Sequence, residues 1–136
     1  MKDCLFCKII AGEIPNTKVY EDENTYAFMD ITPVIPGHVL MVPKEHSRNI
    51  FDASDEVLSK IAPVLKKISR AVKDATGSDG INVHENNEPA SGQVVFHLHF
   101  HIIPRFENDG LKMWHGREYS SPAEMSELAE KIKKEL

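Results

Sequence analysis

Three histidines occupy alternate positions of one segment, His97-Leu98-His99-Phe100-His101. In an extended chain successive side chains point to opposite faces, so the three imidazoles are expected to share one face while Leu98 and Phe100 fill the other. Histidine titrates near neutral pH, so one neutral ring can attack phosphorus while a neighbouring ring donates a proton to the phosphate or the leaving group. The spacing therefore predicts a face that handles a phosphate or a metal ion.

The middle ring, His99, is the expected nucleophile. Attack requires one free ring nitrogen, with the proton on the other nitrogen held by an acceptor, for which a backbone carbonyl of the same segment would serve. The product would be a covalent phosphohistidine that water resolves. Phosphoryl transfer depends mainly on positioning and electrostatics, so donors are also needed for the non-bridging oxygens. The nearby candidates are Asn86, Gln93, His97 and His101.

A second group of candidate ligands is the cysteine pair. Cys4 and Cys7 are the only cysteines of the chain. Their spacing lets both thiolates reach one tetrahedral ion, and two histidines from elsewhere would complete a structural zinc site. Ordinary buried thiols and a redox pair are the alternatives, although no βαβ thioredoxin pattern surrounds the motif. A further alternative is a catalytic zinc ion held by the three triad histidines with a bound water.

These residues must be positioned by one α+β domain, which is expected to span residues 1–136. Runs of β-favouring residues between Asn, Asp, Pro and Gly predict strands over 17–21, 25–29, 38–42, 80–85 and 94–104. Apolar periodicity predicts helices over 4–10 and 54–76, and Ser121 with Glu124 forms a capping box that starts a third helix. Pro63 is expected to kink the long helix or to divide it into two.

Composition limits the class of protein. The chain carries sixteen basic and twenty-one acidic side chains, for a formal net charge of −5. This charge repels phosphate backbones and argues against nucleic acid or a membrane surface as a partner. No stretch approaches the about 20 apolar residues of a membrane span, and no leader pattern is seen, so a cytoplasmic protein is expected.

The segment His97–Ile103 resembles the alternating signature of the histidine-triad (HIT) nucleotide hydrolases and transferases. Other matching stretches are Asp30-Ile31, Pro36-Gly37-His38, Val42-Pro43-Lys44-Glu45-His46, Asn86-Asn87 and Gly92-Gln93. The resemblance covers residues 4 to 105 as the core, with a tail and helix over 106–136. By analogy with the small Hint-like branch, it implies a five-stranded antiparallel sheet with helices, continued across a homodimer.

The resemblance also implies an activity. The chain would be a hydrolase or nucleotidyl transferase that cleaves a purine nucleoside phosphoramidate, or a related α-phosphate bond, through a nucleotidyl-His99 intermediate flanked by His101 and His97. Asp30 would hold the ribose hydroxyls, and no organic cofactor is expected. The phosphate would lie against Asn86, Gly92, Gln93 and Val94. The base would pack on Leu5, Phe6, Ile9, Phe28 and Ile31. A dinucleoside polyphosphate hydrolase, or a nucleotide-binding module with little catalysis, are the alternatives.

The cysteine pair has a counterpart in this resemblance. Several bacterial members of the family are similar to this chain in carrying the pair, which acts there with a histidine after a strand and with the first triad histidine. The resemblance therefore implies a structural zinc ion on Cys4, Cys7, His46 and His97. His99 would then react together with His101.

Two residues depart from the family pattern. Val94 stands where serine or threonine is frequent and cannot donate a side-chain hydrogen bond to the leaving group. Glu88 stands where glycine is common, so phosphate access or product preference is expected to differ. The third triad residue, His101, is not glutamine, which points to hydrolysis over the hexose-phosphate uridylyltransferase branch. Arg105 could meet phosphate or end its strand in solvent, and His38 is expected only to satisfy a local hydrogen bond.

Overall fold

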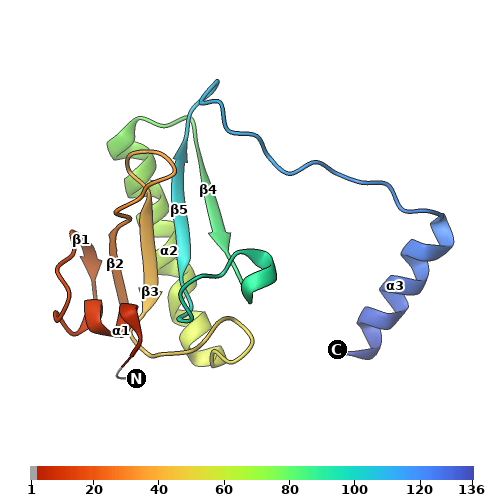
Figure 1. Cartoon of the computed structure of the whole chain (residues 1–136), viewed down its shortest axis with the longest axis horizontal. Helices are drawn as coiled ribbons and strands as arrows, with labels where there is room; N and C mark the ends of the chain where they lie inside the picture. The colour runs from red at the N-terminus through yellow and green to blue at the C-terminus, as the bar shows by residue number, and fades with distance from the viewer. Residues whose placement is uncertain (1–2) are drawn as a thin grey trace.

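A five-stranded antiparallel sheet forms the centre of the computed structural model, which describes residues 3–136 (Figure 1). The strand order is β1-β2-β3-β5-β4. The strands are β1 (Lys18–Glu21), β2 (Thr25–Met29), β3 (Val39–Pro43), β4 (Gly80–Glu85) and β5 (Phe100–Arg105). The helices are α1 (Leu5–Ile10), α2 (Asp55–Thr76) and α3 (Pro122–Lys134), with a short 3-10 turn, η1 (Pro89–Ser91). The predicted α+β fold with a five-stranded antiparallel sheet is confirmed.

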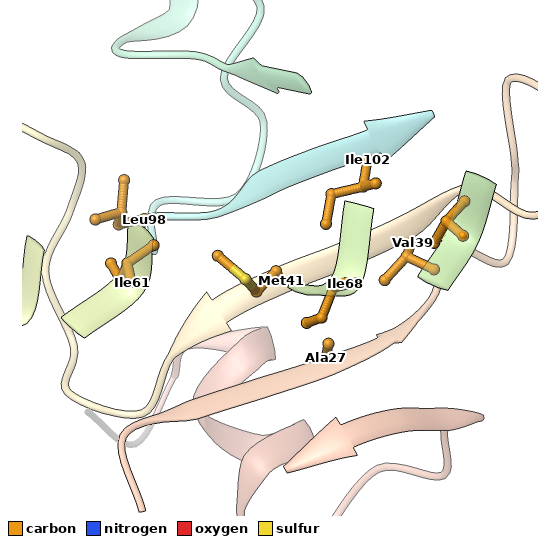
Figure 2. Close-up of a cluster of buried hydrophobic side chains, with 8 residues drawn as sticks. Ala27, Val39, Met41, Ile61, Ile68, Leu98 and Ile102 are labelled. Atoms are coloured by element: carbon orange, nitrogen blue, oxygen red, sulfur yellow. The ribbon is translucent and has the colours of Figure 1, made fainter. Parts of the chain in front are cut away.

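The long helix α2 packs across one face of the sheet (Figure 2). It begins at Ser54, whose hydroxyl accepts a hydrogen bond from the Val57 amide, and ends at Gly77, which adopts a left-handed conformation with φ 66°. The buried cluster on this face is Ala27, Val39, Met41, Ile61, Ile68, Val72, Leu98 and Ile102. The helix is continuous through Pro63, so the alternative of two shorter helices is wrong, and the kink stays a prediction. We infer that burial of the helix face offsets the roughly 3 kcal/mol cost of an internal proline.

The other face of the sheet carries α1. Its apolar side chains join residues of β2 and β3 in a second buried cluster, which consists of Phe6, Ile9, Tyr26, Phe28, Leu40 and Val42. The Phe6 ring lies edge-on to both His97 and His99, at 6.0 and 5.1 Å between ring centroids. The triad histidines therefore lie on the α1 face, opposite the face that α2 covers.

The triad segment is only partly a strand. The expected strand over 94–104 begins instead at Phe100, and β5 pairs with β3 from Val39 to Met41 only. Further along β3, Pro43 has no amide hydrogen, and its carbonyl is 2.8 Å from Nε2 of His97 rather than bonded to a neighbouring strand. The Leu98 amide donates to the Ser47 carbonyl at 2.8 Å. The segment before Phe100 is thus held outside the sheet, yet its side chains still alternate between the two faces.

The C-terminal part leaves the sheet after β5 and leads to α3, which stands apart from the rest of the chain (Figure 1). No residue of α3 is buried. The hydroxyl of Ser121 caps the helix, as predicted, but the Glu124 carboxylate accepts from Ser120 instead of completing the box with Ser121. That residues 1–136 form one domain, and that two copies share the sheet, stay predictions. Within residues 3–136 no helix combines the length and apolarity needed to cross a membrane.

Candidate active site and metal centre

His99 lies at the centre of the site, 6% exposed, with one of its ring nitrogens bonded to the backbone. Its Nδ1 is 2.7 Å from the carbonyl oxygen of His97. A carbonyl only accepts, so Nδ1 carries the proton and the unshared electron pair lies on Nε2. Burial lowers the pKa of His99 from its ordinary value, which favours this neutral form. The contact expected of a nucleophilic histidine is present.

His101 is oriented by a second buried histidine, His38. The Val34 amide donates to Nδ1 of His38 at 3.2 Å, so the His38 proton lies on Nε2. This Nε2 is 2.9 Å from Nδ1 of His101, which must accept, and the His101 proton is therefore on its own Nε2. Burial lowers the pKa of His101 to about 4, with the nearby His99 and His38 adding to the effect. His101 thus offers an N–H donor beside the unshared pair of His99.

Sequence reasoning missed the role of His38 in this site. His38 was expected to satisfy only a local bond, but its ring touches a residue 63 positions away. The available signal was its place in the stretch Pro36-Gly37-His38, which matches the family pattern. The Asp30 carboxylate approaches the same ring, with Oδ2 3.6 Å from Nδ1 of His38.

A cavity of about 420 Å³ opens beside His99 and His101. Eight further residues that were predicted to bind the nucleotide line it: Leu5, Phe6, Ile9, Phe28, Asp30, Ile31, Gly92 and Val94. An apolar wall and a single carboxylate therefore share one cavity with two histidine rings. Such a cavity suits a ligand with a flat apolar part and hydroxyl groups, and the N–H of His101 can donate to a ligand oxygen.

Three of the predicted residues do not line this cavity, namely Asn86, Gln93 and His97. The Gln93 amide is directed into the protein: its Oε1 accepts from the Glu88 amide at 2.8 Å and its Nε2 donates to the Arg48 carbonyl at 2.7 Å. Its donor capacity is used in holding a loop, so the side chain is not placed for phosphate. Asn86 lies next to Gly92, because its Nδ2 would be 3.7 Å from a Cβ atom on that glycine, but it does not itself line the cavity.

Arg105 is also not at this site. Its guanidinium forms an ion pair with Asp109 and donates to the Asn82 side chain, so it stabilises the turn after β5. It lines a separate cavity of about 200 Å³ together with Trp114, whose ring stacks on His84. The expectation that Arg105 meets phosphate is therefore replaced by a structural role.

The side chains of Cys4, Cys7, His46 and His97 converge at one point. All four ligand atoms lie within 4.8 Å of one another. Nδ1 of His97 is 3.4 Å from Sγ of Cys4 and 3.2 Å from Nδ1 of His46, and Sγ of Cys7 is 3.4 Å from the latter nitrogen. Ligand bonds of about 2.0–2.3 Å in a tetrahedral site imply ligand separations of about 3.3–3.8 Å, so the set fits a zinc-sized ion. These four residues form a candidate metal site.

The other nitrogen of His97 is also engaged, because Nε2 lies 2.8 Å from the Pro43 carbonyl oxygen and donates its proton there. This leaves Nδ1 as a ligand atom with a fixed ring orientation, the arrangement usual for a metal-binding histidine. Among residues 3–136 the one other cluster of this kind is Asp30, His38 and His101, and the three triad histidines do not form a metal site together.

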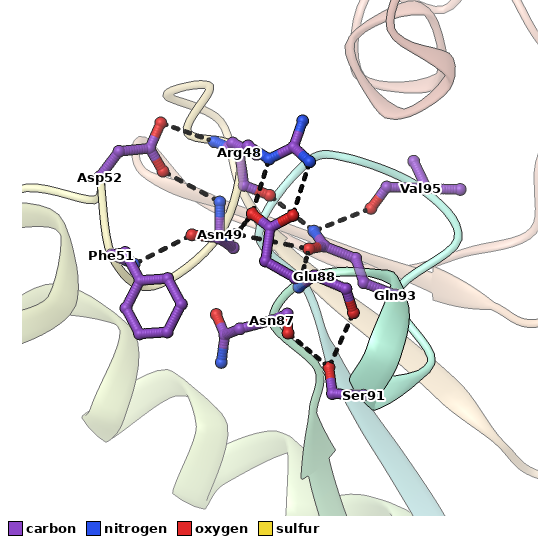
Figure 3. A network of polar contacts seen from close by, with 9 residues as sticks. All are labelled: Arg48, Asn49, Phe51, Asp52, Asn87, Glu88, Ser91, Gln93 and Val95. Atoms are coloured by element: carbon purple, nitrogen blue, oxygen red, sulfur yellow. Dashed lines mark hydrogen bonds and ion pairs between the residues drawn. The ribbon is translucent and has the colours of Figure 1, made fainter.

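A polar network fixes the loop before the triad segment (Figure 3). Arg48 donates to both carboxylate oxygens of Glu88, and Asn49 donates to one of them. Glu88 adopts φ 71°, a conformation that favours glycine. Glu88, which departs from the family pattern, is thus held by hydrogen bonds from Arg48 and Asn49, and neither contact was predicted from the sequence.

Comparison with known proteins gives consistent matches. Residues 11–108 match the family described as HIT domain. Protein hit of Bacillus subtilis is 42% identical over 99% of this chain and 95% of its own length. An adenosine 5′-monophosphoramidase of Candida albicans is 41% identical over 98% of this chain and 91% of its own. An adenylylsulfatase of Arabidopsis thaliana is 45% identical over 80% of this chain and 55% of its own.

Solved structures agree. A protein from Streptococcus mutans UA159 superposes with a TM-score of 0.94 at 44% identity, covering 99% of this chain and 86% of that chain. A zinc-bound histidine triad family protein from Mycobacterium smegmatis gives a TM-score of 0.77 at 32% identity, covering 96% of this chain and 98% of that one. The structural similarity spans nearly the whole chain, including the segments that carry the cavity and the Cys/His cluster.

Proposed function

Because this chain belongs to the HIT-domain family, we propose that it hydrolyses purine nucleoside phosphoramidates, or related derivatives of the α-phosphate, through a nucleotidyl-His99 intermediate. The observation that carries the proposal is the bond from Nδ1 of His99 to the His97 carbonyl, which leaves Nε2 unprotonated beside a cavity with an apolar wall and one carboxylate. The activities for which two relatives are named, a monophosphoramidase and an adenylylsulfatase, support a hydrolase acting on a bond to an adenylyl group.

The first step would be attack of His99 Nε2 on the α-phosphorus, with breakage of the bond from phosphorus to the leaving nitrogen. The anionic phosphate and the Asp30 carboxylate both favour uptake of one proton by the His38–His101 pair when substrate binds. That proton passes from Nε2 of His101 to the leaving nitrogen, which departs as an amine.

Water would complete the cycle. It attacks the same phosphorus, returns one proton to the His38–His101 pair and releases the nucleoside monophosphate from His99. Asp30 is proposed to receive the ribose hydroxyls and the wall of Phe6, Ile9 and Phe28 to pack on the base, since all four line the cavity. Val94 lacks a hydroxyl, so protonation of the leaving group falls to His101.

We also propose that the Cys/His cluster holds a structural zinc ion. Its support is the donor set of two thiolates and two imidazoles, their mutual separations, and the zinc-bound relative from Mycobacterium smegmatis. When bound, the ion would cross-link the N-terminal end of α1, through Cys4 and Cys7, to His46 and to the triad segment. His99 is not part of that cluster, which keeps its Nε2 available for chemistry.

The decisive experiment is the intact mass of the protein after rapid quenching with an adenosine phosphoramidate. We expect a mass increase of one adenylyl group on the wild type and none on His99→Ala, whose turnover should fall by roughly 10³-fold or more. His84→Ala, which changes a histidine outside the cavity, is the matched control and should form the adduct. Zinc content of the same samples is measured alongside.

Two results would contradict the proposal. Undiminished turnover by His99→Ala would remove the covalent intermediate. Nucleotide binding without any turnover would make the protein a nucleotide-binding module. A parallel assay with a dinucleoside polyphosphate tests the remaining alternative, because faster cleavage of that compound would assign a different leaving group. The homodimer and the cytoplasmic location stay predictions.

A further inference from the structure

The loop over residues 86–93 is joined to the segment over residues 48–52 by charged and amide side chains (Figure 3). Nε and Nη2 of Arg48 donate to the two carboxylate oxygens of Glu88 at 2.8 and 2.7 Å. The side-chain Nδ2 of Asn49, a residue only 2% exposed, donates to the same carboxylate at 2.8 Å. The Glu88 side chain is therefore held by three donors from one segment.

The backbone of Glu88 adopts φ 71° and ψ 160°. Residues with a Cβ atom rarely take this conformation, which glycine adopts without strain. A glutamate at this position therefore needs compensating contacts, and the three donors supply them. Glu88 therefore strains the local backbone, but its side chain stabilises the contact between residues 86–93 and residues 48–52.

A second set of bonds connects Glu88 to the cavity. Its amide donates to Oε1 of Gln93 at 2.8 Å, and Nε2 of Gln93 donates to the Arg48 carbonyl at 2.7 Å. Gln93 is 4% exposed and lies between Gly92 and Val94, which both line the cavity with His99. The position of Gly92 and Val94 is thereby tied to the Arg48–Glu88 pair.

We propose that Glu88 is a positioning residue that, through Arg48 and Gln93, holds Gly92 and Val94 in place to receive the α-phosphate. The inference rests on the proposed function, which supplies the phosphate. The charge of the Glu88 carboxylate is balanced by Arg48, which also lies over the Phe96 ring at 4.1 Å. The pair therefore fixes the loop without placing an uncompensated negative charge beside an anionic substrate.

The test compares the affinity of AMP with that of adenosine, which lacks the phosphate, by calorimetry on the full-length protein. For Glu88→Gly we expect about a five- to tenfold loss of AMP affinity, an adenosine affinity unchanged within about twofold, and no loss of thermal stability. Glu88→Gln keeps an acceptor for Asn49 and should lie between wild type and Glu88→Gly. Glu107→Gln, the same change at an exposed residue outside the network, should match the wild type.

Steady-state kinetics adds a readout that a purely structural role would not give. With an adenosine phosphoramidate, Glu88→Gly should raise KM by a similar factor while kcat changes little, and Arg48→Ala should reproduce this pattern. Equal weakening of AMP and adenosine would overturn the inference, because Glu88 would then only stabilise the fold. Unchanged or tighter AMP binding by Glu88→Gly would overturn it as well. If the wild type binds no AMP, the proposed function itself fails.

Discussion

His97 and His101 lie on either side of His99 on the same face of the segment, yet their surroundings differ at every ring nitrogen. His97 is fully buried, with Nδ1 among two thiols and an imidazole and Nε2 on the Pro43 carbonyl. His101 has Nδ1 on His38 and its Nε2 proton available in the cavity. Identical residue types at equivalent spacing thus serve different purposes.

The comparison teaches that the number of ring nitrogens left free decides what a triad histidine can do. His97 retains none, because Nδ1 lies in the Cys/His cluster and Nε2 bonds to the Pro43 carbonyl, so its role is structural. His99 retains one unprotonated nitrogen, and His101 retains one protonated nitrogen. Substitutions that remove each ring should therefore separate stability from catalysis.

The largest effect is expected for His97→Ala. It removes a proposed metal ligand and leaves a void at a fully buried position, so the free energy of unfolding should fall by roughly 3–5 kcal/mol or more. Urea denaturation and zinc analysis of the purified protein measure this. If His97→Ala does not fold, Cys4→Ser provides a second test, because it changes a less buried residue of the same candidate metal site. Retention of the metal by both variants at wild-type stability would disprove a structural role for the cluster.

The next effect concerns catalysis alone. His101→Ala should lower kcat by roughly 10²- to 10⁴-fold, the usual range for loss of a general acid, while zinc content stays at the wild-type level. His84→Ala is the matched control, since His84 faces His101 in the β4–β5 register but does not line the cavity. A wild-type kcat in His101→Ala would show that another group protonates the leaving group. His97 and His101 would then not differ in their contribution to catalysis.

The smallest effect is on the pH dependence of stability. The pKa of His101 is lowered to about 4 by burial and by His99 and His38, with Asp30 opposing and His84 adding slightly. The unfolded chain, with an ordinary pKa of about 6.5, binds more protons between about pH 6.5 and about pH 4, so the free energy of unfolding falls as pH decreases through that window.

His101→Gln removes this titration. Between about pH 7 and about pH 5 the variant should therefore lose about 1 kcal/mol less stability than the wild type, a figure reduced for solvent screening. Urea denaturation of both proteins at the two pH values gives the difference, in which acid effects on the Cys/His cluster cancel. An equal loss in both proteins would mean that His101 titrates normally in the fold.

Most of the fold could be predicted because its signals are local. Ser54 and Gly77 mark the ends of α2, and the alternation of apolar residues at 98, 100 and 102 gives the buried face correctly. The start of β5 could not be predicted, because its pairing with β3 ends at Met41, on a strand more than fifty residues earlier in the chain. Side chains alternate between two faces in any extended chain, whether or not it pairs in a sheet. The face of each triad residue was therefore predicted correctly even though residues 94–99 are not part of β5.

In the candidate site, too, local contacts could be predicted from the sequence and contacts between distant residues could not. His99 and its backbone partner are two residues apart, and that contact was within reach of sequence reasoning. The bonds of His38 to His101 and of Arg48 to Glu88 join positions 63 and 40 residues apart, and no pattern in the sequence specifies them. Gln93 was assigned to phosphate because its type suits an anion, whereas its buried amide is used to hold the loop.

The acceptor for the His99 ring proton has an evolutionary consequence, because it is a main-chain oxygen. Every amino acid carries the same carbonyl, so no point substitution at position 97 can delete the acceptor; only a shift of the backbone can. A descendant chain could exchange the ligating imidazole for another residue and still inherit the reactive tautomer. The proposed metal ligation and the orientation of the proposed nucleophile are thus separately heritable, although residue 97 contributes to both.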